Sequence, residues 1–373
     1  MPSGAKSGRF LVLGAGLVGG LLAIALAERG AEVWLAGEGS HKTATALSYG
    51  GVPWWAGGDG GLGSLQAQAP QHWQQLQERH GDLGLVDAEL WLHWRGQLNP
   101  AAMGAFPKGG RCLSAAEMQE REPLLLGTPL DGAIQLPYLR LDPMRLLSGL
   151  GCRYGQLGIK RSGSLWGEEL KKAIANNDQT VICAGAHSVG LLEHLHLPVP
   201  DLLKLSWAGV WHIPDLAMGG ERVLMPLQGL RQQGEQAIGI NQPQMVLDPG
   251  MAPGPGGDGI LLGQTSWFGL SLEKPPNQIQ DRQALIAAAE LLLPRDIDAV
   301  LDSGEWHQQP VSFSSDGLPL VGLLLPDQAI SLCAGFSMAF ALVPVLVPLV
   351  AEAIIDLDWQ PLKRLGLHLQ RSS

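Results

Sequence analysis

Three glycines near the N-terminus have the spacing that binds the pyrophosphate of a dinucleotide. Gly14, Gly16 and Gly19 follow an apolar run at residues 10–13 and precede a second apolar run that ends at residue 27. Gly14 allows a sharp turn, Gly16 lets phosphates approach the backbone, and Gly19 lets the helix pack closely on the strand. The free amides and the positive end of the helix dipole then face the phosphates. The spacing therefore predicts a strand, a glycine turn and a helix that hold a dinucleotide.

The residues after this helix supply an acid that could bind the adenosine ribose. Gly30 and the largely apolar run at residues 31–36 predict a helix stop and a second strand. In dinucleotide folds the ribose ligand is an acid that lies about 20 residues beyond the glycines. Glu38 lies 24 residues after Gly14 and directly follows Gly37. We predict that Glu38 is the ribose ligand; a solvated loop acid is the alternative.

Two long uncharged segments raise the alternative of a signal peptide or a membrane span. The first, residues 10–27, follows two basic residues, but its glycines occupy the motif positions and a second predicted strand follows it. The second, residues 329–351, contains one glycine and two prolines, which favours a buried strand, a turn and a helix. We expect no membrane segment.

The bulk composition excludes several classes of protein. At 373 residues, with a hydrophobic fraction of 46% and a charged fraction of 16%, the chain can form two globular domains. A formal charge of -10 without a basic tract argues against nucleic acid as a partner. The cysteines, at positions 112, 152, 183 and 333, form no CxxC pair, which is typical of a reducing cytoplasm. The histidines show no ligand spacing, so we expect no metal site.

The remaining pattern alternates strands and helices and then becomes rich in strands. A capping box at Ser114 and Glu117 and an aspartate cap at Asp142 each predict a helix start. The glycine- and proline-rich segment at 248–259 predicts a long surface connection. The predicted helices are 71–79, 143–150 and 281–293, the predicted strands are 85–94, 179–183, 205–213, 223–226, 237–241 and 259–265, and residues 328–355 predict a strand, a turn and a helix.

Four stretches in this order resemble one known family. They are residues 12–19, 181–188, 316–322 (Asp-Gly-Leu-Pro-Leu-Val-Gly) and 333–340. Together they resemble the D-amino-acid-oxidase-like family of FAD-dependent oxidoreductases, in its glycine oxidase and sarcosine oxidase branch. The resemblance covers nearly the whole chain and implies bound FAD; a nicotinamide cofactor would leave the C-terminal matches unexplained.

The resemblance implies an α/β fold with two intertwined domains. One is a Rossmann-type FAD-binding domain like that of glutathione reductase, and the other is an α+β substrate domain with a large mixed or antiparallel sheet. The implied FAD-binding domain comprises residues 1–84, 140–203 and 308–373, and the implied substrate domain comprises residues 85–139 and 204–307.

The resemblance also assigns the residues that would contact FAD. Ala184 and Gly185 have the alternative of simply ending a core strand, and Ser337 that of a helix cap. Non-covalent binding is implied, because Gln309 stands where sarcosine-oxidase-like members carry the attachment cysteine. The implied FAD contacts are Gly14, Ala15, Gly16, Leu17, Val18, Gly19, Gly37, Glu38, Ser48, Tyr49, Gly50, Gly51, Ala184, Gly185, Ser188, Gly335, Phe336, Ser337, Met338 and Ala339.

The chain departs from the family at the position that would bind a substrate carboxylate. Amino-acid-oxidising members carry an arginine immediately before Pro310, and this chain has Gln309. A neutral amide cannot form the bidentate, charge-assisted pair. Either Arg231 or Arg140 supplies the charge instead, or the substrate is not a simple amino acid. Trp267 is a further pocket candidate, with core packing as its alternative.

These observations predict an FAD-dependent oxidoreductase that acts on a small molecule. The reading that fits them best is oxidation of an amine or amino acid by hydride transfer to flavin N5, with reoxidation by oxygen. Two alternatives stay open: a dehydrogenase of a hydroxy acid or alcohol with another electron acceptor, and a flavoprotein whose site has decayed. The sequence makes no prediction of oligomeric state.

Overall fold

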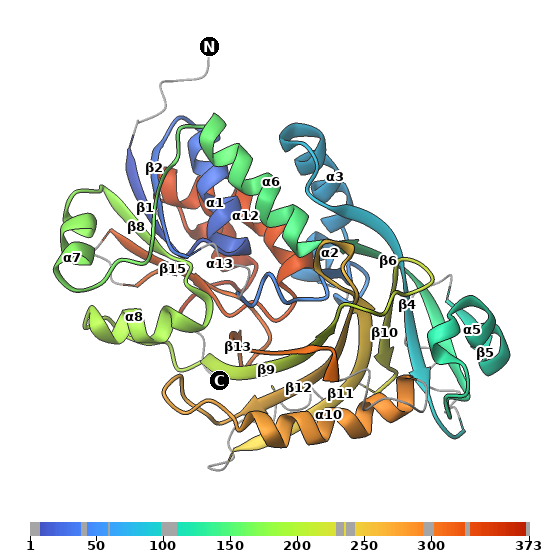
Figure 1. Ribbon diagram of the computed structural model, residues 1–373. Helices are drawn as coiled ribbons and strands as arrows, with labels where there is room; N and C mark the ends of the chain where they lie inside the picture. Colours follow the sequence, from blue (N-terminus) through green and yellow to red (C-terminus); the bar gives the residue numbers. More distant parts are fainter. Residues whose placement is uncertain are drawn as a thin grey trace.

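The strands of this protein form two sheets, which lie in two halves of the molecule (Figure 1). The computed structural model describes residues 8–38, 43–58, 60–97, 110–228, 235, 243–293, 302–324 and 329–370. The six-stranded sheet has the order β14-β15-β8-β1-β2-β7, with β1 (Arg9–Leu13), β2 (Glu32–Ala36), β7 (Lys160–Ser162), β8 (Gln179–Ile182), β14 (Leu320–Leu323) and β15 (Ile330–Ala334).

The six-stranded sheet is almost entirely parallel and has helices on both faces. Its neighbouring strands are parallel except for β14, which runs antiparallel to β15. Helices α1 (Leu17–Glu28) and α12 (Ala339–Asp356) cover one face, and α7 (Gly167–Ala175) and α8 (Ser188–His194) cover the other (Figure 1). Val12 packs toward α1 and α12, whereas Leu11 and Leu13 pack toward α7 and α8. Burial on both faces explains the apolar run at residues 10–13 of β1 and the apolar end of β8 at Val181 and Ile182.

The second sheet has nine strands in the described residues and is mixed, which agrees with the large mixed or antiparallel sheet that the resemblance implies. It runs in the order β13-β9-β12-β11-β10-β4-β6-β3, with β5 beside β6, and only β10 and β4 pair in parallel. Its strands are β3 (Gly51–Val52), β4 (Leu85–Trp94), β5 (Arg111–Ser114), β6 (Gly132–Leu141), β9 (Leu203–Ile213), β10 (Arg222–Pro226), β11 (Gln244–Pro253), β12 (Ile260–Phe268) and β13 (Glu305–Ser314).

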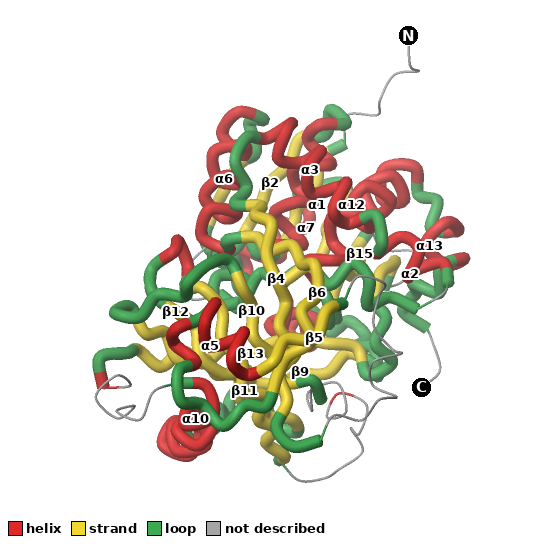
Figure 2. Tube along the Cα trace, turned by 90° about the vertical axis from the view of Figure 1, so that its right-hand side faces the viewer, coloured by secondary structure: helices red, strands yellow, loops and turns green. Residues whose placement is uncertain are grey.

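The two faces of the nine-stranded sheet have different neighbours. Helix α10 (Gln278–Leu292) covers the outer face, where Trp211 and Leu262 pack against Ala289 (Figure 1). The inner face turns toward the six-stranded domain, and β13 contacts the short 3-10 turn η2 (Gly185–His187) there. Figure 2 shows the helices α1, α3, α6 and α12 gathered at one end and the strands of this sheet below them. The inner face is therefore the place where the two halves can share a ligand.

Two of the remaining helices begin at the caps that the sequence predicts. In the capping box, the Glu117 N–H donates to Ser114 Oγ (3.3 Å) and the Ser114 N–H donates to the Glu117 carboxylate (2.9 Å). Asp142 accepts from the amides of Met144 and Arg145. The remaining helical elements are α2 (Gly61–Gln66), α3 (Ala69–His80), α5 (Ala115–Arg121), η1 (Pro123–Leu125), α6 (Pro143–Gln156), η3 (Pro255–Gly257) and α13 (Gln360–Arg364).

The prediction of a surface connection at residues 248–259 is wrong in its first half. Strand β11 continues to Pro253, with a bulge between Leu247 and Gly250. Met251 and Ala252 are fully buried, so these two apolar residues hold the backbone in the sheet despite their glycine- and proline-rich surroundings. The predicted strand at 237–241 lies outside the described residues.

The second uncharged segment forms a strand, a turn and a helix, as predicted. Within the described residues, α12 is the one helix long and apolar enough to cross a membrane, and about two thirds of it (67%) is buried inside the protein. Pro344 lies inside this helix and cannot donate to the carbonyl of Phe340. The indole N–H of Trp73 donates to that carbonyl instead (2.7 Å), so α3 supplies the hydrogen-bond donor that Pro344 lacks.

The strand pairing of the nine-stranded sheet does not follow the predicted domain boundaries. Strand β13 pairs with β9 along its whole length, from Glu305 to Ser314, so a boundary at residue 308 divides a strand of the nine-stranded sheet. Residues 51–52 also join that sheet, through β6. The division of the chain into domains stays a prediction.

Candidate cofactor and substrate site

The glycine turn lies where the parallel strands of the six-stranded sheet end. Gly14 has a φ of +116°, and a Cβ there would clash with the carbonyl of Cys183 on the neighbouring strand. A Cβ on Gly19 would clash with the carbonyl oxygen of Gly14. A Cβ on Gly16 would meet only Thr45 Oγ1, at 3.3 Å. The fold itself requires Gly14 and Gly19, whereas the open space at Gly16 fits a ligand that approaches the backbone.

The N-terminus of α1 is available to an anion. The first turn contains no acidic side chain, and the amides of Val18 and Gly19 precede the first intrahelical bond, from Gly20 to Gly16 (2.8 Å). Thr45 Oγ1 accepts from the Leu17 amide at 3.3 Å. Thr45 was not among the predicted cofactor contacts. The available signal was the run of small residues around it, at 43–51. Its hydroxyl lies beside the predicted phosphate position.

Glu38 lies beside the glycine turn, at the carboxyl end of β2. The preceding Gly37 approaches the turn so closely that a Cβ there would lie 2.7 Å from the Ala15 nitrogen. The Glu38 side chain is exposed. This position suits the predicted contact with an adenosine ribose, which stays a prediction.

Two buried hydroxyls mark the other predicted cofactor segments. Ser188 begins α8 after the turn at Ala184 and Gly185, and Ser337 precedes α12 after Gly335. Among the described residues, neither hydroxyl has a hydrogen-bond partner, although both oxygen atoms are buried. Buried polar groups are almost always satisfied, so a polar ligand fits Ser337, which is half-buried, whereas Ser188 is fully buried and out of a ligand's reach.

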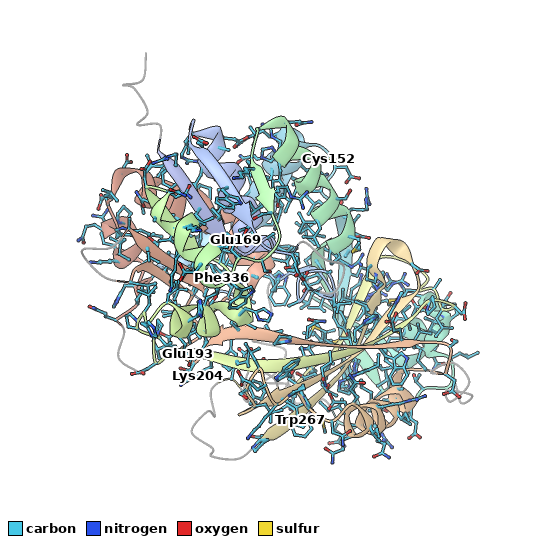
Figure 3. The ribbon with its side chains drawn as sticks, turned by 60° about the vertical axis from the view of Figure 1, so that its left-hand side comes forward. Cys152, Glu169, Glu193, Lys204, Trp267 and Phe336 are labelled. Carbon is cyan, nitrogen blue, oxygen red and sulfur yellow. The ribbon has the colours of Figure 1, made fainter. Side chains whose placement is uncertain are left out.

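The side chains around Ser337 point into the core and leave their backbone to face a ligand. Phe336 is buried (Figure 3), and Met338 Sδ accepts from Gln66 Nε2 at 3.7 Å. Gly335 has a φ of +75°, and its Cβ position lies 3.3 Å from Ser314 at the end of β13. The amides of Ala339 and Phe340 begin α12 and lie at the positive end of its dipole.

The segment 48–51 joins the two halves of the molecule. Tyr49 donates its hydroxyl to the carbonyl of Gly263 on β12 (2.9 Å), and its own carbonyl accepts from Arg140 Nε (3.1 Å). Burial and, secondly, the charge of Asp248 raise the pKa of Tyr49, so the hydroxyl stays a donor. A Cβ on Gly50 would clash with the carbonyl of Leu141. The position of this segment is therefore tightly fixed.

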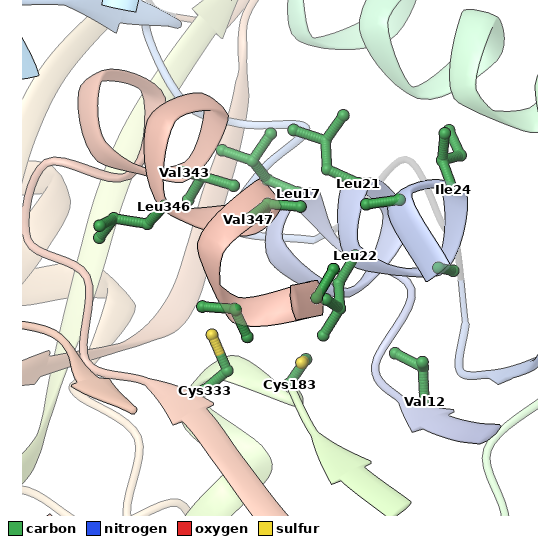
Figure 4. Close-up of a cluster of buried hydrophobic side chains, with 14 of the residues drawn as sticks. Val12, Leu17, Leu21, Leu22, Ile24, Cys183, Cys333, Val343, Leu346 and Val347 are labelled. Carbon is green, nitrogen blue, oxygen red and sulfur yellow. The ribbon is translucent and has the colours of Figure 1, made fainter. Parts of the chain in front are cut away.

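Two cysteines lie below the glycine turn but take no part in chemistry. Cys183 and Cys333 are buried on neighbouring strands and face each other beneath α1 and α12 (Figure 4). A hydrogen bond between the thiols and their burial raise the pKa of Cys183. Leu17 also points into this core, toward Val343 and Val347 (Figure 4). Protonated, buried thiols are inert, so both cysteines have a structural role.

Five segments that lie far apart in the sequence thus come together at one edge of the six-stranded sheet, where they suit a dinucleotide. We call these segments the FAD cradle: residues 14–19, 37–38, 48–51, 184–188 and 335–339. The chain matches the profile of the family described as FAD dependent oxidoreductase over residues 9–353. It belongs to this family. FAD is therefore its cofactor, and the protein is an FAD-dependent oxidoreductase.

Solved structures of the same fold include several amine-oxidising enzymes. A glycine oxidase from Bacillus cereus ATCC 14579 superposes with a TM-score of 0.70 at 16% identity, covering 98% of this chain and 99% of that one. An iminodiacetate oxidase from Chelativorans sp. BNC1 gives 0.68 at 18% identity, covering 98% and 97%. A glycine oxidase from Geobacillus kaustophilus gives 0.69 at 17%, covering 98% and 100%. A sequence comparison with curated proteins finds no match. At these identities the superpositions show the fold.

Arg140 has a structural role in this FAD-dependent oxidoreductase and is not free to bind a substrate. It is 2% exposed, and besides the Tyr49 carbonyl it donates to Glu221 (3.0 Å) and to the carbonyl of Pro253 (2.8 Å). Every guanidinium nitrogen therefore has a protein partner. The candidate role of Arg140 in binding a carboxylate does not fit this geometry. Arg231, the other candidate, lies outside the described residues.

Trp267 lies on the outer face of the nine-stranded sheet, under α10. Its indole N–H donates to Asp281, which also accepts from Gln308 Nε2 (2.6 Å). Burial raises the pKa of Asp281 against the opposing effect of these hydrogen bonds. Figure 3 shows Trp267 well away from Phe336. The packing alternative for Trp267 fits the structure, and the pocket role does not.

Gln309 lies on the inner face, opposite to its neighbour Gln308. It opposes Ala208 of β9, and side chains alternate along β13, so the Gln308 bond to Asp281 turns Gln309 toward the FAD-binding half. Of the substrate-site candidates in the described residues, Gln309 is therefore the one placed to meet a substrate. The described part of the chain contains no group of three or more His, Cys, Asp or Glu that could hold a metal ion.

Proposed function

We propose that this enzyme oxidises a small-molecule amine. One observation carries the proposal. The inner face of the nine-stranded sheet, with Gln309 on it, lies opposite the five segments of the FAD cradle. When bound, FAD supplies the redox chemistry by accepting a hydride from the carbon next to the substrate nitrogen. The amine-oxidising enzymes of the same fold support this choice of substrate.

The protein's own part in this reaction is to bind, orient and stabilise charge. The amides at the start of α12, with the helix dipole behind them, would stabilise negative charge on the cofactor. The segment 48–51, fixed by Tyr49 and Arg140, would set the distance between cofactor and sheet, and positioning of this kind contributes much of the rate. No side-chain nucleophile is needed.

The setting of the reaction is also part of the proposal. A net charge of -10 and cysteines without a CxxC spacing support a cytoplasmic enzyme whose partners are small molecules, not nucleic acid or membrane. We further propose that oxygen reoxidises the cofactor.

Anaerobic mixing of the purified holoenzyme with candidate substrates tests the proposal. Amines should bleach the flavin absorbance band, and admission of air should restore it with formation of hydrogen peroxide. Bleaching by hydroxy acids alone would contradict amine oxidation and favour the dehydrogenase alternative. Bleaching by neither class, with FAD bound, would indicate a site that has lost its activity.

A further inference from the structure

We infer that the substrate of this site carries no carboxylate group, and that Gln309 binds a neutral polar group of the substrate in its place. The inference rests on the proposed function, because it names the kind of amine that would be oxidised. It follows from what the inner face of the nine-stranded sheet presents around Gln309.

The wall around Gln309 is built from neutral groups. On the neighbouring strand β9, Ala208 lies between Gln309 of β13 and Ser266 of β12. Gln264 Nε2 donates to Ser266 Oγ at 3.2 Å, so these two side chains share the face. The small Ala208 leaves room between two amides and a hydroxyl. Such a surface can donate to and accept from a neutral carbonyl, hydroxyl or amide.

The charged groups of this face are either paired or distant. His307, two residues along β13, lies 3.7 Å from the carboxylate of Glu305, so any positive charge on the ring is offset by an adjacent negative one. Lys204 opposes Phe313, which places it about 13 Å along the strand from Gln309, at the start of β9 (Figure 3). Arg140 is fully engaged. The described residues therefore place no cation beside Gln309.

This arrangement selects against an anion. A carboxylate that leaves water to face this wall loses its hydration and gains no cation in exchange, which is strongly unfavourable. A neutral polar group loses less hydration and regains a hydrogen bond from the Gln309 amide. An arginine at this position would reverse the preference by pairing with the carboxylate.

Isothermal titration of the holoenzyme with benzoate and benzamide tests the inference. The two ligands have the same shape and differ in charge, and their binding needs no turnover. The wild type should bind benzamide at least about 10-fold more tightly than benzoate, which corresponds to ~1.4 kcal/mol. Gln309→Arg should strengthen benzoate binding by a similar factor. Gln308→Arg is the matched control: its side chain meets Asp281 on the outer face, and the ligand preference should not change.

The other possible results also decide for or against the inference. Benzoate binding by the wild type as tight as benzamide binding would overturn it, and loss of that binding in Arg231→Gln would assign the carboxylate to Arg231. If the wild type binds neither ligand, a gain of benzoate binding in Gln309→Arg but not in Gln308→Arg supports the inference, and no gain overturns it. The proposed function fails separately, if no amine bleaches the flavin.

Discussion

At the scale of single residues, one buried arginine connects the two halves of the molecule. Arg140 is held by the carbonyls of Tyr49 and Pro253 and by Glu221, whose own side chain is 46% exposed. The arginine thereby ties the segment that borders the cofactor to two strands of the substrate sheet. Arg140 stabilises the structure through its position, because its hydrogen-bond partners are mostly backbone carbonyls.

Arg140→Leu should lower the free energy of unfolding by about 2–4 kcal/mol, because it leaves buried carbonyls unpaired. Chemical denaturation followed by circular dichroism measures this. Arg145→Leu is the control: Arg145 pairs with Asp82 on the surface, where both side chains are about half exposed, and should cost less than about 1 kcal/mol. Equal losses in the two variants would contradict the role given to Arg140.

At the scale of elements, α12 depends on α3 for a hydrogen bond that it cannot make itself. Trp73 donates to the Phe340 carbonyl, which Pro344 leaves free. Trp73→Phe should therefore destabilise the protein by about 1–3 kcal/mol, because the carbonyl loses its donor.

A double-mutant cycle isolates this bond. Pro344→Ala restores a backbone N–H four residues after Phe340, so the cost of Trp73→Phe should fall by about 1 kcal/mol in that background. Thermal unfolding of the four proteins gives the coupling. Strictly additive effects would show that the indole N–H contributes nothing through this carbonyl.

Elements with local signals could be predicted from the sequence, whereas contacts between distant segments could not. The glycine spacing identified the turn before α1, and the Ser114 and Asp142 caps located two helix starts. The continuation of β11 through Met251 was missed, because glycine and proline content hid two residues that tertiary packing buries. The face of Trp267 and the engagement of Arg140 depend on partners far along the chain, which no local pattern reveals.

The resemblance assigns segments to FAD, and these assignments stay predictions; it did not include every residue that the structure places beside them. Thr45 was not singled out, because a small-residue run gives no spacing that identifies one hydroxyl. Gln309 was recognised as a departure from sequence alone. Its orientation, opposite to Gln308, needed the pairing of β13 with β9.

At the scale of the whole molecule, all three tyrosines belong to hydrophobic clusters of the two halves: Tyr138 and Tyr154 are buried, and Tyr49 is half-buried. Burial raises the pKa of Tyr49, Tyr138 and Tyr154 above the ordinary value near 10. The unfolded chain would ionise them near that value, so their contribution to stability is complete below about pH 10 and is lost as the pH rises above it.

A spectrophotometric titration checks this expectation. Tyrosinate absorbance should stay absent in the folded protein above pH 10 and then appear for all three tyrosines together as the protein unfolds. Stability should fall by about 4 kcal/mol per pH unit in this range if all three contribute. Gradual ionisation near pH 10 with unchanged circular dichroism would contradict the burial of these hydroxyls.

The central claim is that distant segments form one cradle for FAD, and Gly16 tests it most directly. Its φ of -80° suits any residue, and a Cβ there would meet only the Thr45 hydroxyl, at 3.3 Å, which must move slightly. Gly16→Val should therefore fold, but the added side chain should occupy the space of the phosphates. Gly155→Val in α6, with open space around it, is the control.

The decisive measurement is the FAD content of the purified proteins, read from the visible absorbance spectrum. The wild type and Gly155→Val should carry FAD, and Gly16→Val should be folded and colourless. A colourless wild type, or a Gly16→Val protein with undiminished FAD, would contradict the account.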